Sequence, residues 1–130
     1  MLENYGAKSN LKCPSLDVAS KNNYCMSYFG SGLHAAKVKH AAASMLIMDS
    51  GRLSTAYNYC YPVLGWWYFA SYPQLKTDLN RHAEKVNAAY CDGHVASPRK
   101  TVVTEVVTSQ HDYPNRHHIY FWDPSGSYIN

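Results

Sequence analysis

Residues 81–95 read RHAEKVNAAYCDGHV, and this stretch is the most informative in the chain. The apolar-rich segment 86–91 leads into Asp92-Gly93, and the short apolar segment 94–96 follows. Asp-Gly between two such segments is a strong hairpin signal, because a type I′ turn needs positive φ at both central residues. We therefore predict a β-hairpin closed by Asp92-Gly93. With His82 ahead of the first strand, the stretch has the pattern His-x9-Asp-Gly.

His82 and Asp92 invite a metal or catalytic interpretation, which strand geometry opposes. If residues 83–91 are mainly strand, the two ends lie about 25–30 Å apart, whereas metal ligands converge within a few Å of one ion. We expect separate local roles, with Asp92 in the turn and His82 hydrogen-bonded ahead of the strand. Cys91 and His94, which flank the turn, make a weak catalytic pair because a hairpin end has no cleft to exclude water.

Short apolar segments on either side of the hairpin predict further strands. Alternating Tyr24, Met26 and Tyr28 give a period of two, and the apolar run 43–48 is short and closed by a turn. Residues 101–108 are rich in β-branched side chains, which favour strands. The predicted fold class is α+β, a mostly antiparallel β-sheet. Strands are predicted at 22–29, 43–48, 101–108 and 118–122, and a helical turn at 74–82.

Length and composition narrow the class of protein. A chain of 130 residues predicts a single domain, 1–130. The low charged fraction of 16% and the 12 tyrosines are more typical of a surface-displayed or secreted protein than of a cytosolic enzyme. The net charge of +3 is spread along the chain, and its longest basic run is Arg99-Lys100, so no nucleic-acid partner is expected. No apolar run reaches the length of a membrane span.

The four cysteines, at positions 13, 25, 60 and 91, contain no Cys-x-x-Cys pair. Their spacing argues against a zinc ribbon or a thioredoxin-type site. They are either buried thiols or partners in one or two disulfides of an oxidising compartment. Cys13 with Cys25, the pair closest in sequence, is the first candidate for a disulfide.

A run of four aromatic residues is the main candidate binding surface. Consecutive aromatics cannot all face one side of a strand, so some are expected to be exposed or to cover an edge. Core or edge packing is one interpretation, and a surface that stacks on sugars or contacts a partner is the other. The four residues are Trp66, Trp67, Tyr68 and Phe69.

Two further clusters offer ligands for metal ions. The histidines could be the metal ligands of a metal-dependent hydrolase. Adjacent strand residues point to opposite faces, however, so only one histidine of a neighbouring pair easily joins a given site. The C-terminal oxygen donors would form a structural calcium site, but they lack the EF-hand pattern. The leading expectation is no metal and no cofactor. The histidines are His94, His111, His117 and His118, and the oxygen donors are Asp112, Asn115, Asp123 and Asn130.

Four segments, taken in order, resemble the prepilin-type, processing-associated His-x9-Asp-Gly family of type IV pilin-like and type II secretion pseudopilin-like proteins. His82, Asp92 and Gly93 match its signature. The resemblance spans about residues 11–97 and leaves 98–130 as an unassigned C-terminal extension. The other matching segments are Leu11-Lys12-Cys13-Pro14-Ser15, with the family's Cys-Pro-Ser, Asn22-Asn23-Tyr24-Cys25-Met26-Ser27-Tyr28, and Met45-Leu46-Ile47-Met48-Asp49-Ser50.

The resemblance implies a pilin-like globular head and a non-enzymatic structural subunit of a type II secretion or type IV pilus-like filament. Its partners would be other pilin-like subunits or secretion-system proteins, at the periplasm or cell surface. Family members begin with a leader and a long apolar stalk helix that anchors them in the membrane and packs on the sheet of the head. Residues 1–130 contain neither, so either the chain is a truncated head domain with both segments upstream or this member has lost its anchor. In either case we expect an apolar sheet face that is exposed or covered by a partner. Residues 83–85, Ala-Glu-Lys, replace the family's Gly-rich stretch.

Overall fold

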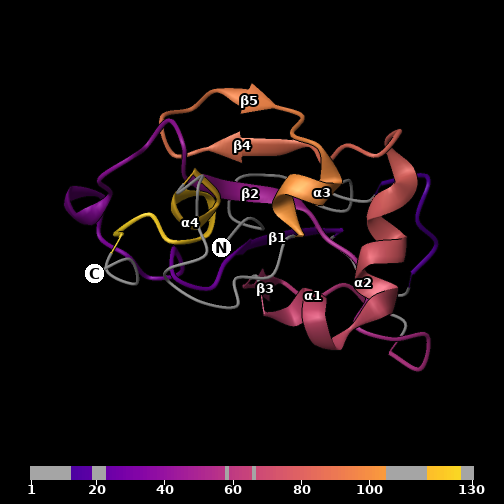
Figure 1. The fold of residues 1–130 in the computed structure, drawn as a ribbon. Helices are drawn as coiled ribbons and strands as arrows, with labels where there is room; N and C mark the ends of the chain where they lie inside the picture. Colours follow the sequence, from indigo (N-terminus) through magenta and orange to yellow (C-terminus); the bar gives the residue numbers. More distant parts are fainter. Residues whose placement is uncertain (1–12, 19–22, 58, 66, 105–116, 127–130) are drawn as a thin grey trace, which may run out of the picture.

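The computed structural model describes residues 13–18, 23–57, 59–65, 67–104 and 117–126, without the side chains of 117–119 (Figure 1). No helix within these ranges is long and apolar enough to cross a membrane. In chain order the elements are β1 (Tyr24–Ser27), η2 (Ala35–Lys37), β2 (Met45–Asp49), β3 (Val63–Leu64), α1 (Tyr68–Ser71), α2 (Pro73–Asp78), η3 (Leu79–Arg81), β4 (Ala88–Tyr90), β5 (Val95–Ala96), α3 (Lys100–Val103) and α4 (His117–Trp122).

The strands form one sheet in the order β3-β1-β2-β4-β5. The pairs β1/β2, β2/β4 and β4/β5 are antiparallel, and the short strand β3 pairs in parallel with β1. Figure 1 shows the β4–β5 hairpin at one edge of the sheet and β3 at the other. The predicted α+β, mostly antiparallel fold class is therefore confirmed.

The predicted hairpin is present, but its turn differs from the expected type. The backbone N–H of Tyr90 donates to the carbonyl of His94 at 2.9 Å, which leaves the three-residue loop 91–93. Gly93 alone in this loop has positive φ, at 93°. This is the three-residue hairpin loop that ends on a left-handed glycine rather than a type I′ turn. Tyr90 and His94, not Cys91 and His94, face each other across it, with ring centroids 4.3 Å apart.

Two strand predictions are wrong. Residues 100–103 form α3 and residues 117–122 form α4, whereas 105–108 lie outside the described residues. Val103 and Trp122 are buried, and the Trp122 indole N–H donates to the Val103 carbonyl at 3.1 Å. Packing between these two helices overrides the β propensity of the local sequence.

One face of the sheet is the main core face. Cys25, Met48 and Ala88 are paired across β1, β2 and β4, and all three are buried. They belong to one apolar cluster with residues from α1 to α4, so the helices cover this face. The helix residues in the cluster are Phe69, Leu75, Leu79, Val103, Phe121 and Trp122.

The opposite, outer face of the sheet is also apolar but is only partly covered. Along β1 and its neighbours, Tyr24, Met26 and Ile47 alternate with the core residues and are half-buried. Leu46 and Val95 are 49% and 72% exposed. The main apolar face of the sheet, which we expected to be exposed or covered by a partner, is instead covered by helices of the chain itself. The outer face is the one that is partly accessible among the described residues.

Candidate functional site

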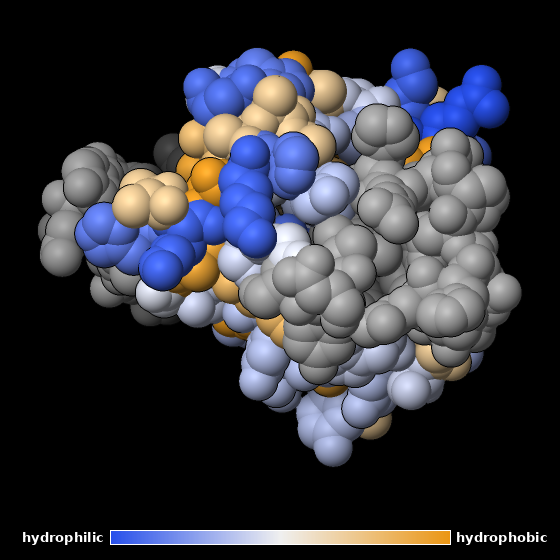
Figure 2. Space-filling model, turned by 60° about the vertical axis from the view of Figure 1, so that its left-hand side comes forward, coloured by the Kyte–Doolittle hydropathy of each residue, from blue (hydrophilic) through white to orange (hydrophobic). Residues whose placement is uncertain are grey.

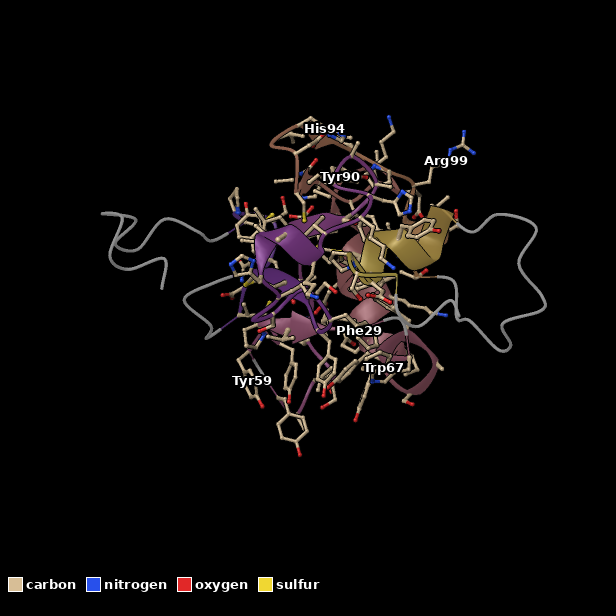
Figure 3. All side chains as sticks on the ribbon, turned by 90° about the vertical axis from the view of Figure 1, so that its left-hand side faces the viewer. Phe29, Tyr59, Trp67, Tyr90, His94 and Arg99 are labelled. Atoms are coloured by element: carbon tan, nitrogen blue, oxygen red, sulfur yellow. The ribbon has the colours of Figure 1, made fainter. Side chains whose placement is uncertain are left out.

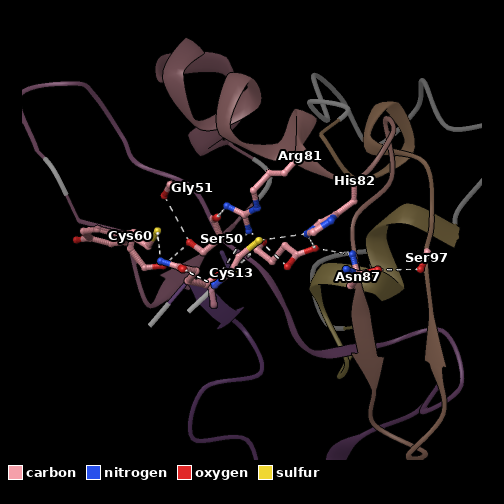
Figure 4. Close-up of polar contacts among 12 residues, drawn as sticks. Cys13, Ser50, Gly51, Cys60, Arg81, His82, Asn87 and Ser97 are labelled. Carbon is pink, nitrogen blue, oxygen red and sulfur yellow. Dashed lines mark hydrogen bonds and ion pairs between the residues drawn. The ribbon is translucent and has the colours of Figure 1, made fainter. Parts of the chain in front are cut away.

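A buried polar cluster lies where β1 begins and β2 ends (Figure 4). Its members come from segments far apart in the chain. Each of the four segments of the family resemblance contributes at least one residue. Their side chains bond to one another and to backbone groups. We define the cluster as the side chains of Cys13, Asn23, Asp49, Arg81 and His82, together with the Ser50 carbonyl and the Asn87 backbone N–H that bond to them.

The Asp49 carboxylate is the centre of the buried polar cluster. Its Oδ2 accepts a hydrogen bond from the Asn87 backbone N–H at 2.7 Å and lies 3.5 Å from His82 Nε2. Its Oδ1 lies 3.4 Å from Arg81 Nη2. The Asp49 and Arg81 side chains are only 2% and 3% exposed. Each of these two buried charges stabilises the other, because removing one would leave the other buried without an opposite charge beside it.

Arg81 and Asn23 extend the cluster to the backbone of neighbouring segments. Arg81 Nη1 donates to the Ser50 carbonyl at 2.7 Å. Asn23 Oδ1 accepts from the Cys13 backbone N–H at 2.6 Å, and its Nδ2 lies 3.5 Å from Cys60 Sγ. These contacts join the segment at residue 13, the start of β1, the end of β2 and the end of η3.

Cys13, His82 and Asp49 bring together the residue types of a nucleophilic triad, but in the wrong geometry. In a triad the base contacts the nucleophile through one ring nitrogen and is oriented through the other. Here the same nitrogen, His82 Nε2, is 3.6 Å from Cys13 Sγ and 3.5 Å from Asp49 Oδ2. Cys13 is also buried. The arrangement suits structural anchoring.

All four cysteines are free thiols in the structure, so the predicted Cys13–Cys25 disulfide is not formed. Cys13 contacts His82, whereas Cys25 Sγ lies 3.9 Å from the Asp49 carbonyl. Burial raises the pKa of the Cys25 thiol, and burial likewise raises the pKa of Cys60. Neutral, buried thiols are poor nucleophiles.

The remaining signature residues lie apart from the buried polar cluster. The Asp92 carboxylate accepts hydrogen bonds from the His94 backbone N–H at 3.1 Å and contacts His94 Nδ1 at 2.6 Å. These contacts, the backbone one first, lower the pKa of Asp92. Pro14 lies in an exposed turn that the Leu16 N–H closes onto the Cys13 carbonyl. As predicted from strand length, His82 and Asp92 have separate local partners.

The described residues contain no group of three or more His, Cys, Asp or Glu side chains placed to hold a metal ion. Of the predicted oxygen donors, Asp123 accepts from the N–H and hydroxyl of Ser125 at 3.1 and 2.7 Å. His94 contacts Asp92. The other predicted ligands lie outside the described residues or side chains: His111, His117, His118, Asp112, Asn115 and Asn130.

A second region, at the β3 edge of the sheet, is an open hollow of about 740 Å³. We call it the aromatic hollow, because three tyrosines dominate its walls and Trp67, 36% exposed, packs edge-to-face on Tyr28 beside it. Figure 3 places Phe29, Trp67 and Tyr59 at this end of the molecule and Tyr90 and His94 at the other. The hollow is lined by Tyr28, Ser31, Tyr61, Pro62, Val63 and Tyr68.

The predicted aromatic run divides between core and surface. Phe69 is buried against Trp122, with ring centroids 5.7 Å apart, whereas Trp67 and Tyr68 lie at the aromatic hollow. Trp66 is outside the described residues. Sequence reasoning missed Tyr28 and Tyr61 as neighbours of the run. The only available signal was the period-two alternation that ends at Tyr28.

Comparisons of the chain with protein-family models, with curated proteins and with solved structures found no match.

Proposed function

We propose that this chain is a pilin-like or pseudopilin-like head domain, a non-enzymatic structural subunit of a type II secretion or type IV pilus-like filament. The observation that carries the proposal is the convergence of the resembling segments. His82 Nε2 lies 3.6 Å from Cys13 Sγ and 3.5 Å from Asp49 Oδ2, and these three residues come from three different segments. Residues that meet at one anchoring point form a single structural signature, which supports reading the four segments together.

The chemistry of the buried polar cluster favours a structural role over an enzymatic one. Asp49, Arg81 and Asn23 direct their polar groups at backbone groups of neighbouring segments. General acid–base or nucleophilic catalysis needs groups that reach a substrate. A cluster of this kind holds loops in place, as a filament subunit with no catalytic task requires. The proposal includes no metal or cofactor.

The outer face of the sheet provides the second line of support. In the family that the chain resembles, a stalk helix packs on the sheet of the head. Here the outer face has half-buried Tyr24, Met26 and Ile47 beside exposed Leu46 and Val95. An apolar surface of this kind suits packing against an amphipathic helix or a neighbouring subunit. We propose an exported protein, at the periplasm or cell surface, whose partners are pilin-like subunits or secretion-system proteins.

The direct test is the gene and its product in the native cell. We expect an in-frame leader and apolar helix upstream of Met1, and the processed protein in the filament fraction sheared from the cell surface. Translation that starts at Met1, together with retention in the cytosol, would overturn the proposal.

Matched variants on two faces test the assembly surface. Leu46→Lys places a charge on the outer face, and we expect it to remove the protein from filaments while circular dichroism shows a folded domain. Val102→Lys is the control, because Val102 on α3 is similarly exposed, 40% against 49%, but lies away from that face. Equal incorporation of both variants would contradict the proposal.

A further inference from the structure

We propose that the aromatic hollow is a binding site for a neutral oligosaccharide. This activity would belong to the surface of the domain and does not depend on assembly into a filament. The hollow lies beside β3, α1 and the residue that follows β1, and its volume of about 740 Å³ is in the range of small-ligand clefts. Its aromatic rings, its hydroxyl groups and its lack of charged side chains all suit such a ligand.

The aromatic rings form a fixed platform. Tyr61 and Tyr68 have centroids 5.6 Å apart, and Tyr68 stacks on Tyr72 at 5.9 Å with an interplanar angle of 27°. Trp67 lies 5.4 Å from Tyr28 and 5.7 Å from Tyr68. Rings that pack on one another lose little conformational entropy when a ligand binds. Flat, partly exposed rings offer the apolar surface on which the C–H face of a sugar ring can pack.

Four of the residues that line the hollow carry a hydroxyl group. Tyr28, Tyr61, Tyr68 and Ser31 each contribute a hydroxyl that both donates and accepts hydrogen bonds. Partial burial raises the pKa of Tyr68, and the nearby phenols of Tyr61, Tyr72 and Tyr28 raise it further. The phenols therefore lie close together, and the Tyr68 hydroxyl stays protonated at neutral pH. Sugar hydroxyls also both donate and accept, so they match this lining.

The lining also selects against charged ligands. Its six lining residues include no aspartate, glutamate, lysine, arginine or histidine. Figure 2 shows strongly hydrophilic side chains gathered in the upper half of the face, whereas the described residues at the lower end, where Figure 1 has β3 and α1, are mainly pale. A carboxylate or phosphate would lose hydration in the hollow without gaining a cation. The chemistry therefore favours a neutral sugar over an acidic one.

Proline-rich peptides are the other ligands that dock on aromatic grooves. A proline has no N–H, so such a segment presents mostly carbonyl acceptors. A proline-rich peptide would accept hydrogen bonds from the phenols but would offer few donors to the phenol oxygens. A second exposed aromatic pair, Tyr57 and Tyr59 with centroids 6.1 Å apart, precedes Tyr61 in the chain. It offers further ring surface for a ligand longer than one sugar.

The test is a binding screen with three kinds of probe. The purified chain is applied to an array of neutral gluco-, xylo- and N-acetylglucosamine oligomers, acidic uronic-acid oligomers and a proline-rich peptide, and hits are titrated by calorimetry. We expect binding to at least one neutral series. Trp67→Ala should weaken it about tenfold or more, while Tyr120→Ala, an aromatic on α4 that packs against His40, should leave it unchanged.

A second variant separates loss of the platform from loss of the fold. A Cβ at Gly65 would overlap the Trp67 indole, so Gly65→Ala should displace that ring and weaken sugar binding while every lining side chain remains. Thermal unfolding checks that both variants are folded. The absence of neutral-sugar binding, preferential binding of the acidic oligomers or the peptide, or sugar binding unchanged in Trp67→Ala would each overturn the proposal.

Discussion

The buried polar cluster and the aromatic hollow lie at opposite ends of the same short strand. Asn23, immediately before β1, belongs to the cluster, and Tyr28, immediately after β1, lines the hollow. In the cluster, charged and amide groups are enclosed and face one another. In the hollow, partly exposed aromatic residues line an open surface. One strand thus leads from a region suited to stability to a region suited to binding.

Substitutions in the two regions should have different effects, because they remove different kinds of interaction. Removing one member of a buried charge pair leaves the other without compensation. Removing one exposed ring loses contact area but leaves no unpaired charge. Variants in the cluster should therefore change the free energy of unfolding, and variants in the hollow should change binding. Four substitutions test this contrast, and they follow in order of expected effect on stability.

Asp49→Ala should have the largest effect. It leaves the buried Arg81 guanidinium without its carboxylate, and we expect a loss of about 3–5 kcal/mol in the free energy of unfolding, measured by urea denaturation. Asp92→Ala, at the exposed hairpin turn, is the matched control and should cost far less. A loss below about 1 kcal/mol for Asp49→Ala would mean that the cluster does not stabilise the fold.

Asp78→Asn tests whether a buried carboxylate makes the free energy of unfolding depend on pH. Asp78 bonds to Arg52, in the segment that follows Ser50. Burial alone would raise the pKa of Asp78, but hydrogen bonds from the Arg52 side chain and backbone and from Gln74 outweigh it and leave the pKa lowered. A lowered folded-state pKa adds stability above the unfolded value of about 4, and this stability is lost as pH falls through the folded value.

We expect Asp78→Asn to lose about 1–3 kcal/mol at pH 7, since it removes a hydrogen-bonded charge from Arg52. The difference from the parent protein should shrink as the pH falls below 4. Urea denaturation at a series of pH values measures both effects. A difference that stays constant between pH 7 and pH 3 would contradict the assignment.

Gly93→Ala tests a signature residue that lies outside both regions. Gly93 has a φ of 93°, a conformation that costs an L-residue about 1–2 kcal/mol. We expect a loss of about that size, because nothing lies within 4 Å of the added Cβ and only backbone strain is introduced. Thermal unfolding measures the change. A neutral result would show that the loop relaxes to another turn without cost.

Trp67→Ala should have the smallest effect on stability, about 1 kcal/mol or less, because the indole is partly exposed and loses mainly ring contacts with Tyr28 and Phe29. Urea denaturation and sugar titration of the same preparation measure the two properties together. If Trp67→Ala unfolds the domain as readily as Asp49→Ala, the hollow is part of the core and the contrast between the two regions disappears.

Local sequence patterns predicted the strands β1 and β2 but not the helices α3 and α4, which depend on contacts between distant residues. Alternation at Tyr24 and Met26 predicted β1, and the apolar run before Asp49 predicted β2. The same kind of reasoning failed at 101–108 and 118–122, where α3 and α4 pack on each other through Val103 and Trp122. Strand propensity is weaker than such packing when no neighbouring strand is available.

The sequence by itself determined the position of the hairpin, the two central strands and the mostly antiparallel class, because these depend on side-chain period and on the backbone freedom of Gly93. Only the tertiary structure decided which distant residues meet. Cys13 reaches His82 across 69 positions, and Tyr28, just after β1, packs on Trp67, just before α1. Such contacts depend on chain topology and burial, which a local pattern does not contain. Both the anchoring cluster and the aromatic hollow are products of that topology.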